Sequence, residues 1–316
     1  MMHSVRRRVA IAVVLLASSA FASRASAQQQ HVLVITGLGG EPAYRDAFLD
    51  VARRLHDVAT TGWKVPAEQV TVLTEDATRD AVRFRGRSTK EAVGEAFLAI
   101  ARRARAGDVV FVFVHGHGSG QAGESRVNLP GPDPTAADFA TWLSGFAQQT
   151  VVFVNAASAS GDFQQALAGP RRVVLTATKS AVERNDTRFA GHFVRGLESL
   201  EADANKDGRV TVLEAFDFAR REVEKEYEAD KRMLTEHAVV SDSSLAATVA
   251  LGARAVSSDP RVAALVAERQ ALEDQVATLR ARKATMSDAA YEAELERLLV
   301  AIAEKTRAIR AAGGTP

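Results

Sequence analysis

Short apolar runs alternate with helical patterns over most of the chain, and this alternation predicts an α/β fold. The runs are almost continuously hydrophobic and rich in β-branched residues, which is typical of strands covered on both faces. They are residues 31–36, 70–74, 109–114, 151–155 and 172–178. Between them apolar residues recur at helical spacing, as in Phe48, Val51 and Leu55. We therefore expect βαβ crossovers and a mostly parallel sheet in a three-layer α/β/α sandwich, within a domain spanning residues 28–255.

The pattern changes from about residue 256. Two stretches rich in Ala, Leu, Glu and Arg follow, and apolar residues recur in them at spacings of three and four. A break at Met286 and Ser287 separates them, and Ser287 suits a helix N-cap. We expect a helical hairpin with coiled-coil character over residues 256–316. The hairpin either packs on its own body or mediates self-association or partner binding through residues 259–312.

The first 27 residues have the features of a secretory signal. Three arginines, Arg6 to Arg8, precede an apolar run, and Ala25-Ser26-Ala27 supplies the small residues that signal peptidase accepts. We expect cleavage after Ala27 and export to a periplasm or to the exterior. The later apolar runs are too short for a membrane span, so none is predicted.

The charge balance and the cysteine content exclude several classes of partner and site. Residues 1–27 contain four arginines, Arg6 to Arg8 and Arg24, and no acidic residue. Without them 40 − 4 = 36 basic residues face 39 acidic ones, and this charge balance gives no reason to expect a nucleic-acid partner. The chain has no cysteine. A disulfide, a thiolate zinc site and a cysteine nucleophile are therefore excluded.

The stretch "DANKDGRVTVLE" has the spacing of a calcium-binding EF-hand loop at residues 203–214. Oxygen-bearing side chains alternate at the first, third and fifth positions, glycine stands at the sharp turn, and a glutamate closes the loop. We expect the ligands to be Asp203, Asn205, Asp207, the backbone carbonyl of Arg209, and Glu214. The alternative is a turn rich in Asp and Asn that merely caps the following helix. A single loop suggests a structural ion rather than a sensor.

The turns after strands are the other candidate sites, because ligands of open parallel sheets bind beyond the carboxyl ends of the strands. "VFVFVHGHGSG" places His115 and His117 at such an end, and "VVFVNAASASG" ends in a small, polar turn. A histidine there can serve as a general base, and the adjacent glycines let a substrate backbone come close. We interpret His115 as structural and His117 as the candidate base.

These two blocks resemble the caspase-like clan of cysteine peptidases, and within it the legumain (asparaginyl endopeptidase) branch. The resemblance covers roughly residues 31–240 and implies a caspase-like fold. It puts His117 at the catalytic histidine position and Ser158 of "AASASG" at the nucleophile position. Arg45 of "GEPAYRDAF" resembles the arginine that lines the primary specificity pocket. Gly118, Ser160 and Gly161 of the two turns are then expected to contact substrate.

The chain departs from that family in its nucleophile, because serine stands where the family has cysteine. A serine hydroxyl needs a closely hydrogen-bonded base and usually a third group that orients the base, and no acid near His117 in the sequence supplies it. Three hypotheses follow: a pseudo-peptidase that binds peptide or protein in the old cleft, an active hydrolase that uses Ser158 and His117, and a calcium-stiffened scaffold or interaction protein.

Overall fold

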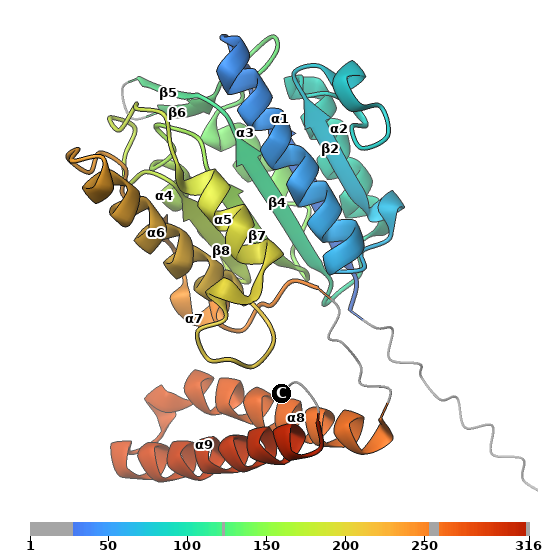
Figure 1. The fold of residues 1–316 in the computed structure, drawn as a ribbon, viewed down its shortest axis with the longest axis vertical. Coiled ribbons are helices and arrows are strands. Elements are labelled where there is room, and N and C mark those ends of the chain that lie inside the picture. The colour runs from blue at the N-terminus through green and yellow to red at the C-terminus, as the bar shows by residue number, and fades with distance from the viewer. Residues whose placement is uncertain (1–27, 122–123, 253–258, 314–316) are drawn as a thin grey trace, which may run out of the picture.

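The computed structural model describes residues 28–121, 124–252 and 259–313, so the predicted signal at 1–27 lies outside the described residues. A seven-stranded sheet crosses the body of the molecule, with helices on both of its faces (Figure 1). Its strand order is β3-β2-β1-β4-β7-β8-β9. Strands β1 to β4, β7 and β8 pair in parallel, and only the edge strand β9 pairs antiparallel. The predicted α/β class with a mostly parallel sheet is confirmed.

All five apolar runs form strands of this sheet, and they form its five interior members. The strands of the sheet are β1 Gln30–Thr36, β2 Val70–Thr74, β3 Gly86–Arg87, β4 Val109–His115, β7 Thr150–Asn155, β8 Arg172–Thr176 and β9 Val239–Val240. The near-continuous hydrophobicity is explained by burial on both faces, because every residue of β4 is buried. Strands β5 Gly118–Gln121 and β6 Glu124–Val127 form a separate antiparallel hairpin that leaves the carboxyl end of β4.

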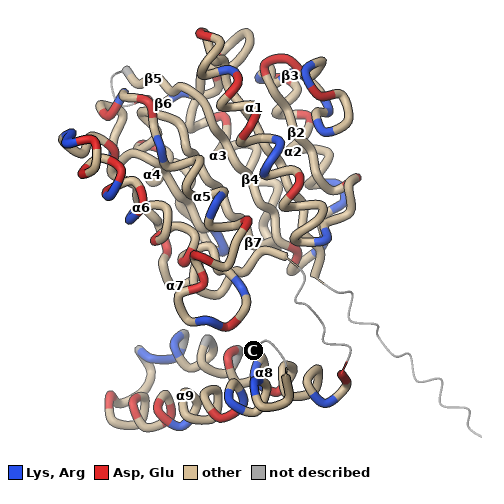
Figure 2. The backbone as a smooth tube through the Cα atoms, in the orientation of Figure 1, with Lys and Arg blue, Asp and Glu red and all other residues tan. Residues whose placement is uncertain are grey.

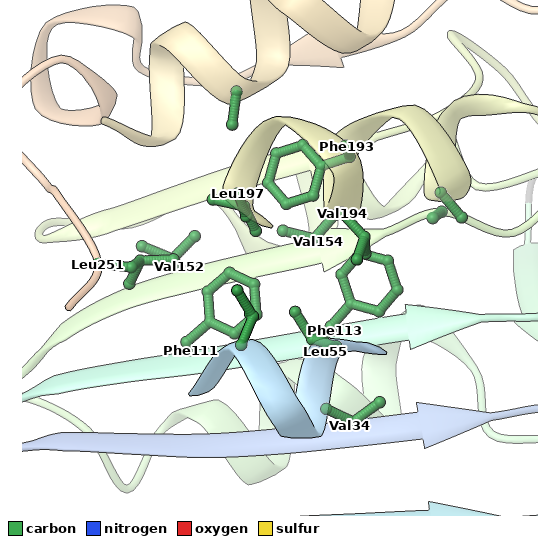
Figure 3. Close-up of a cluster of buried hydrophobic side chains, with 14 of the residues drawn as sticks. Val34, Leu55, Phe111, Phe113, Val152, Val154, Phe193, Val194, Leu197 and Leu251 are labelled. Atoms are coloured by element: carbon green, nitrogen blue, oxygen red, sulfur yellow. The ribbon is translucent and has the colours of Figure 1, made fainter. Parts of the chain in front are cut away.

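Alternate strand residues feed two cores, one on each face of the sheet. Figure 3 shows the first core, where side chains of β1, β4 and β7 such as Val34, Phe111 and Val154 lie in one cluster with Leu55 of α1 and Phe193 of α5. The second core contains Leu33, Val112 and Phe153. The body helices are α1 Pro42–Asp57, α2 Lys90–Arg103, α3 Ala136–Leu143, α4 Phe163–Leu167, α5 Phe189–Glu198, α6 Val212–Ala229 and α7 Ser243–Ala246. Helices α1, α5 and α6 cover the first core, and α2, α3 and α4 cover the second.

The C-terminal segment forms two long helices, α8 Pro260–Ala281 and α9 Asp288–Ala311, which run antiparallel to one another (Figure 1). Ser287 caps α9 by accepting a hydrogen bond from the N–H of Ala290, as the sequence suggested. Two small apolar clusters join the helices, one around Val266 and Ile309 and one around Val276 and Leu298. Neither cluster shares a residue with the cores of the body. Among the described helices, none combines the length and the apolar character needed to span a membrane.

Candidate functional site

The turn that carries His117 and the turn that carries Ser158 lie side by side, because they follow β4 and β7, which are parallel neighbours near the middle of the sheet. Val114 of β4 pairs with Asn155 of β7, and His117 and Ser158 each lie three residues after the member of this pair on their own chain segment. The backbones of the two turns are in very close contact. A Cβ atom added to Gly118 would lie 2.0 Å from the carbonyl oxygen of Ser158, so glycine is required at this position.

Ser158 is buried, and its hydroxyl is engaged with the backbone of Gly118. The Gly118 N–H donates to Ser158 Oγ at 3.1 Å, and the hydroxyl donates to the Gly118 carbonyl at 3.3 Å. Only 2% of the residue is exposed. Among the described residues no hydrogen bond joins Ser158 to His117. The structure therefore brings the two predicted catalytic residues onto adjacent turns without coupling them.

Ser160 and Gly161 fix the turn to the end of β8. Ser160 exchanges hydrogen bonds with Thr178, whose hydroxyl accepts from the Ser160 N–H at 2.8 Å and whose own N–H donates to Ser160 Oγ at 3.2 Å. At Gly161, an added Cβ would lie 2.1 Å from the Ser180 nitrogen. Both residues were predicted to contact substrate, and in this structure their partners belong to the loop after β8.

His117 is half-buried against an aromatic wall provided by helix α1. The ring of Tyr44 meets it edge-on with centroids 4.7 Å apart, and the ring of Phe48 lies 5.2 Å away. Partial burial raises the pKa of the Asp186 carboxyl, and the nearby charge of His117 opposes that shift. An acidic group therefore lies near His117 after all, supplied by the loop between β8 and α5.

His115 is buried and packs against aromatic residues of the core. It packs edge-on against Phe48 with ring centroids 4.6 Å apart. Burial lowers the pKa of its imidazole to about 4, so the ring is neutral at physiological pH. The structural interpretation of His115 is consistent with this environment.

A cavity of about 300 Å³ opens beside the aromatic wall, between α1 and the start of α5. Tyr44, Phe48 and His115 line one side of it, and Asp186, Arg188, His192 and Glu226 line the other. Its polar groups are mostly paired with one another. Arg188 bridges Glu226 and Asp230 at 3.0 and 2.7 Å, and His192 lies 2.8 Å from Glu226.

Arg45 lies at the same edge of the sheet but on the other side of His117 from Ser158, because its segment follows β1. Its side chain is 32% exposed. The guanidinium Nε lies 3.4 Å from Glu75 Oε2, which also accepts the Gly39 N–H at 3.0 Å. The predicted specificity arginine thus has an acidic partner, at the long limit of a hydrogen bond.

The predicted calcium loop at 203–214 folds as a tight loop whose side-chain oxygens accept its own backbone N–H groups. The two carboxylate oxygens of Asp203 accept from Asp207 and Gly208, at 3.0 and 2.8 Å. Lys206 and Gly208 adopt left-handed φ angles of 56° and 80° that close the turn. Glu214 belongs to a capping box with Thr211 at the start of helix α6.

Helix α8 contacts this loop through a buried arginine. Arg269 is 1% exposed, and its Nη2 lies 3.3 Å from Asp207 Oδ2 and 3.1 Å from Glu273 Oε1. Arg209 of the loop also donates to Gln270 Oε1 at 3.3 Å. Across residues 28–121, 124–252 and 259–313, no three His, Asp or Glu side chains gather closely enough to hold a metal ion. One oxygen of Asp207, Oδ2, thus pairs with Arg269, while Oδ1 accepts the Arg209 N–H at 2.9 Å.

Three residues at these sites escaped the sequence analysis. Asp186 approaches His117, Glu75 pairs with Arg45, and Arg269 pairs with Asp207. In each case the partner is at least 30 residues away in the sequence. Only Glu75 carried a usable signal, because it directly follows a predicted strand and therefore belongs to the edge where sites form.

No family model matches the sequence, and no curated protein resembles it closely enough to count as a match. Among solved structures, the chain is similar to drICE, a caspase, over 68% of its own length and 88% of that chain. The sequence identity is 12% and the TM-score is 0.39.

Proposed function

We propose that the protein is a caspase-like, legumain-type peptidase relative that no longer cleaves peptides and instead binds a peptide or protein at the carboxyl edge of its sheet. The observation that carries this proposal is the state of Ser158, which is buried and hydrogen-bonded to the Gly118 backbone. The resemblance in the His-Gly and Ser-Gly turns supports the family, and so does the pairing of β4 with β7, from which the two turns leave side by side.

The hydroxyl of Ser158 is poorly arranged for nucleophilic attack. A serine nucleophile transfers its proton to a base that is hydrogen-bonded to it, and the base is held by a third group. In this chain the Ser158 hydroxyl lies 3.3 Å from the Gly118 carbonyl oxygen, to which it can donate. Turning it toward His117 would break that bond, and a buried oxygen offers little access to a scissile carbonyl. The histidine and its acidic neighbour Asp186 are therefore present without a coupled nucleophile.

Binding is better supported than turnover. Arg45 is partly exposed at the edge, and its 3.4 Å contact with Glu75 is long enough to be replaced by a ligand carboxylate or amide. The cavity lined by Tyr44, Phe48 and His115 offers a second, partly apolar contact for a peptide side chain. We expect peptides with Asp or Asn to bind next to Arg45.

A mixed peptide library tests both halves of the proposal. The chain from Gln28 to Pro316 is assayed in millimolar calcium for cleavage and for binding, beside His117→Ala and Arg45→Ala. We expect no cleavage that depends on His117, and binding that falls about tenfold or more in Arg45→Ala. Arg87→Ala is the matched control, because Arg87 is an exposed arginine at the same edge of the sheet.

Cleavage that disappears in His117→Ala would favour the active hydrolase instead. Ser158→Cys separates the remaining cases, because a thiol is intrinsically more nucleophilic and needs less help from the base. If the turn descends from a peptidase site, this variant should recover slow cleavage after Asn or Asp. A folded but inert Ser158→Cys protein with no peptide binding would leave only the scaffold hypothesis.

We also propose a structural calcium ion in the loop at 203–214, held by Asp203, Asn205, Asp207, the carbonyl of Arg209, and Glu214. The left-handed turns at Lys206 and Gly208 and the inward-facing oxygens of Asp203 support this assignment. Calcium takes about seven oxygen ligands and needs a loop that curls around it. Arg269 supplies positive charge to Asp207 in the present structure, where a cation would otherwise do so.

Export is part of the same proposal. The signal pattern at residues 1–27 supports it, and the calcium of an exterior compartment would suit a loop with a structural ion. The absence of cysteine from the sequence is compatible with export but does not require it.

A further inference from the structure

Helix α9 carries two distinct apolar faces, and the hairpin uses only one of them. The first face contains Leu298 and Ile309, which are 1% and 0% exposed because they pack against α8. The second face contains Leu299 and Val300, which are 48% and 52% exposed. An open groove of about 400 Å³ runs along this second face. Its lining is Glu292, Leu295, Glu296, Leu299, Val300 and Ala303.

The charges that flank this face are divided by sign along the helix. Acidic residues gather toward the N-terminal end of α9 (Figure 2), and Glu292 and Glu296 are the ones on the face. Arg307 lies on the same face toward the C-terminal end, since it follows Ala303 by four residues. Each of these three residues is exposed. Within the described part of the chain, none of the three makes an ion pair or a side-chain hydrogen bond.

This arrangement is complementary to itself when the helix is turned end for end. An antiparallel pair of α9 helices with its two-fold axis between Leu299 and Val300 brings these apolar residues together at the centre. Glu292, seven residues before Leu299, then faces Arg307 of the partner subunit, seven residues after Val300. The two-fold symmetry repeats the pair, so two opposite-charge pairs flank one apolar centre. A parallel pairing would instead place Glu292 against Glu292.

We propose that the exposed face of α9 is a self-association surface that pairs two copies of this chain antiparallel. The packing of the hairpin leaves Leu299 and Val300 about half exposed, and the contact of α9 with the body is near its C-terminal end, where Arg310 donates to the Lys206 carbonyl at 3.2 Å. A second copy of the chain would cover the apolar residues of this face with its own, and would supply the opposite charges that pair with Glu292 and Arg307. Isologous contacts of this kind are the commonest basis of homodimers. The inference does not depend on the function of the serine and histidine turns.

Charge reversal tests the surface and its direction. Sedimentation velocity on the chain from Gln28 to Pro316 should show a dimer whose dissociation constant rises about tenfold in Glu292→Arg and in Arg307→Glu, because each places like charges opposite one another. The double variant should restore the dimer. An equimolar mixture of the two single variants should also pair, because each then meets opposite charges on its partner.

The apolar centre is tested separately. Leu299→Glu combined with Val300→Glu should raise the dissociation constant by about a hundredfold or more. Glu294→Arg is the matched control, since Glu294 is two residues from both Glu292 and Glu296, lies on the opposite side of α9 where it pairs with Arg297, and should leave dimerisation unchanged. Circular dichroism and the thermal midpoint verify that each variant keeps its helices.

Three results would overturn the proposal. The wild-type chain could be monomeric at all accessible concentrations. A dimer could persist unchanged in the double glutamate variant, which would assign it to another surface. The single charge variants could fail to pair with each other while the wild type dimerises, which would exclude the antiparallel register.

Discussion

The serine turn at 158–161 and the calcium-type loop at 203–214 both form hydrogen bonds to backbone N–H groups at a tight turn, but they do so with different side chains. Both reverse the chain tightly, both include a glycine, and both use side-chain oxygens to accept backbone N–H groups. In the serine turn these oxygens are neutral hydroxyls buried under neighbouring backbone. In the loop they are carboxylates that stay partly accessible.

The difference decides what each region can still bind. A hydroxyl that donates and accepts once is largely satisfied, so the serine turn has little capacity left for a substrate. A carboxylate oxygen accepts more than one hydrogen bond and keeps its negative charge. The loop therefore keeps negative charge that a cation could neutralise, and Arg269 neutralises part of it by pairing with Asp207. A sequence motif thus specifies the backbone conformation of a turn, whereas the residues around the turn decide whether its side chains can still bind a ligand.

The largest expected effect is on the serine turn. Gly161→Ala would put a Cβ 2.1 Å from the Ser180 nitrogen, in a contact between two backbones that cannot relax by a rotamer change. We expect a loss of about 3 kcal/mol or more in the free energy of unfolding, measured by urea denaturation. A small effect would mean that the turn is looser than its hydrogen bonds indicate.

Gly191→Ala is the control for this substitution. Gly191 lies in helix α5, and nothing stands within 4 Å of an added Cβ. The exchange should stabilise the protein by about 0.5–1 kcal/mol, because alanine favours a helix interior more than glycine does. If Gly161→Ala lowers the free energy of unfolding and Gly191→Ala raises it, the loss comes from the close contact at the serine turn and not from the exchange of glycine for alanine as such.

Calcium should have the next largest effect, and it acts on the loop. At a calcium concentration of 100 times Kd, we expect stabilisation by about 2.7 kcal/mol, measured as a rise in the thermal midpoint that chelation reverses. Glu214→Gln should abolish the gain, since glutamine keeps the capping box with Thr211 but loses the bidentate carboxylate.

Glu228→Gln removes the same charge from an exposed position of α6 and serves as the control. It should keep the full response to calcium. A wild-type midpoint that does not move in millimolar calcium would favour the reading of the loop as a helix cap alone.

The sequence predicted the sheet well because strand burial is a local property. Runs such as 109–114 are hydrophobic at every position, and only a strand covered on both faces accommodates that pattern in so short a length. The helical hairpin was predicted equally from spacing, and α8 and α9 stand where the two stretches lie. Turn residues such as Ser158 were located correctly at the strand end.

The partners of those residues were not predictable, because they come from distant segments. The sequence contains no pattern that joins Asp186 to His117 or Arg269 to Asp207. Nor does it show that the Ser158 hydroxyl is enclosed by Gly118, since this follows from the approach of two turns whose backbones nearly touch. Chemistry at a site depends on such approaches more than on the motif.

The smallest expected effect, on calcium affinity, tests the role assigned to Arg269. The guanidinium binds Asp207 Oδ2 at 3.3 Å, and an ion in the loop would draw that carboxylate inward. Arginine and calcium therefore compete for one group. Arg269→Met keeps much of the buried volume and removes the competitor, so calcium Kd should fall about tenfold, or about 1.4 kcal/mol, by isothermal titration calorimetry.

Arg209→Met separates this competition from a general loosening of the hairpin. Arg209 contacts α8 through Gln270, yet its side chain pairs with no loop carboxylate, and its backbone carbonyl stays in place as a ligand. Calcium affinity should therefore be unchanged in Arg209→Met. If both variants tighten calcium equally, the hairpin restrains the loop mechanically. If neither does, calcium binding leaves the contact between Arg269 and Asp207 intact, and the arginine does not compete with the ion.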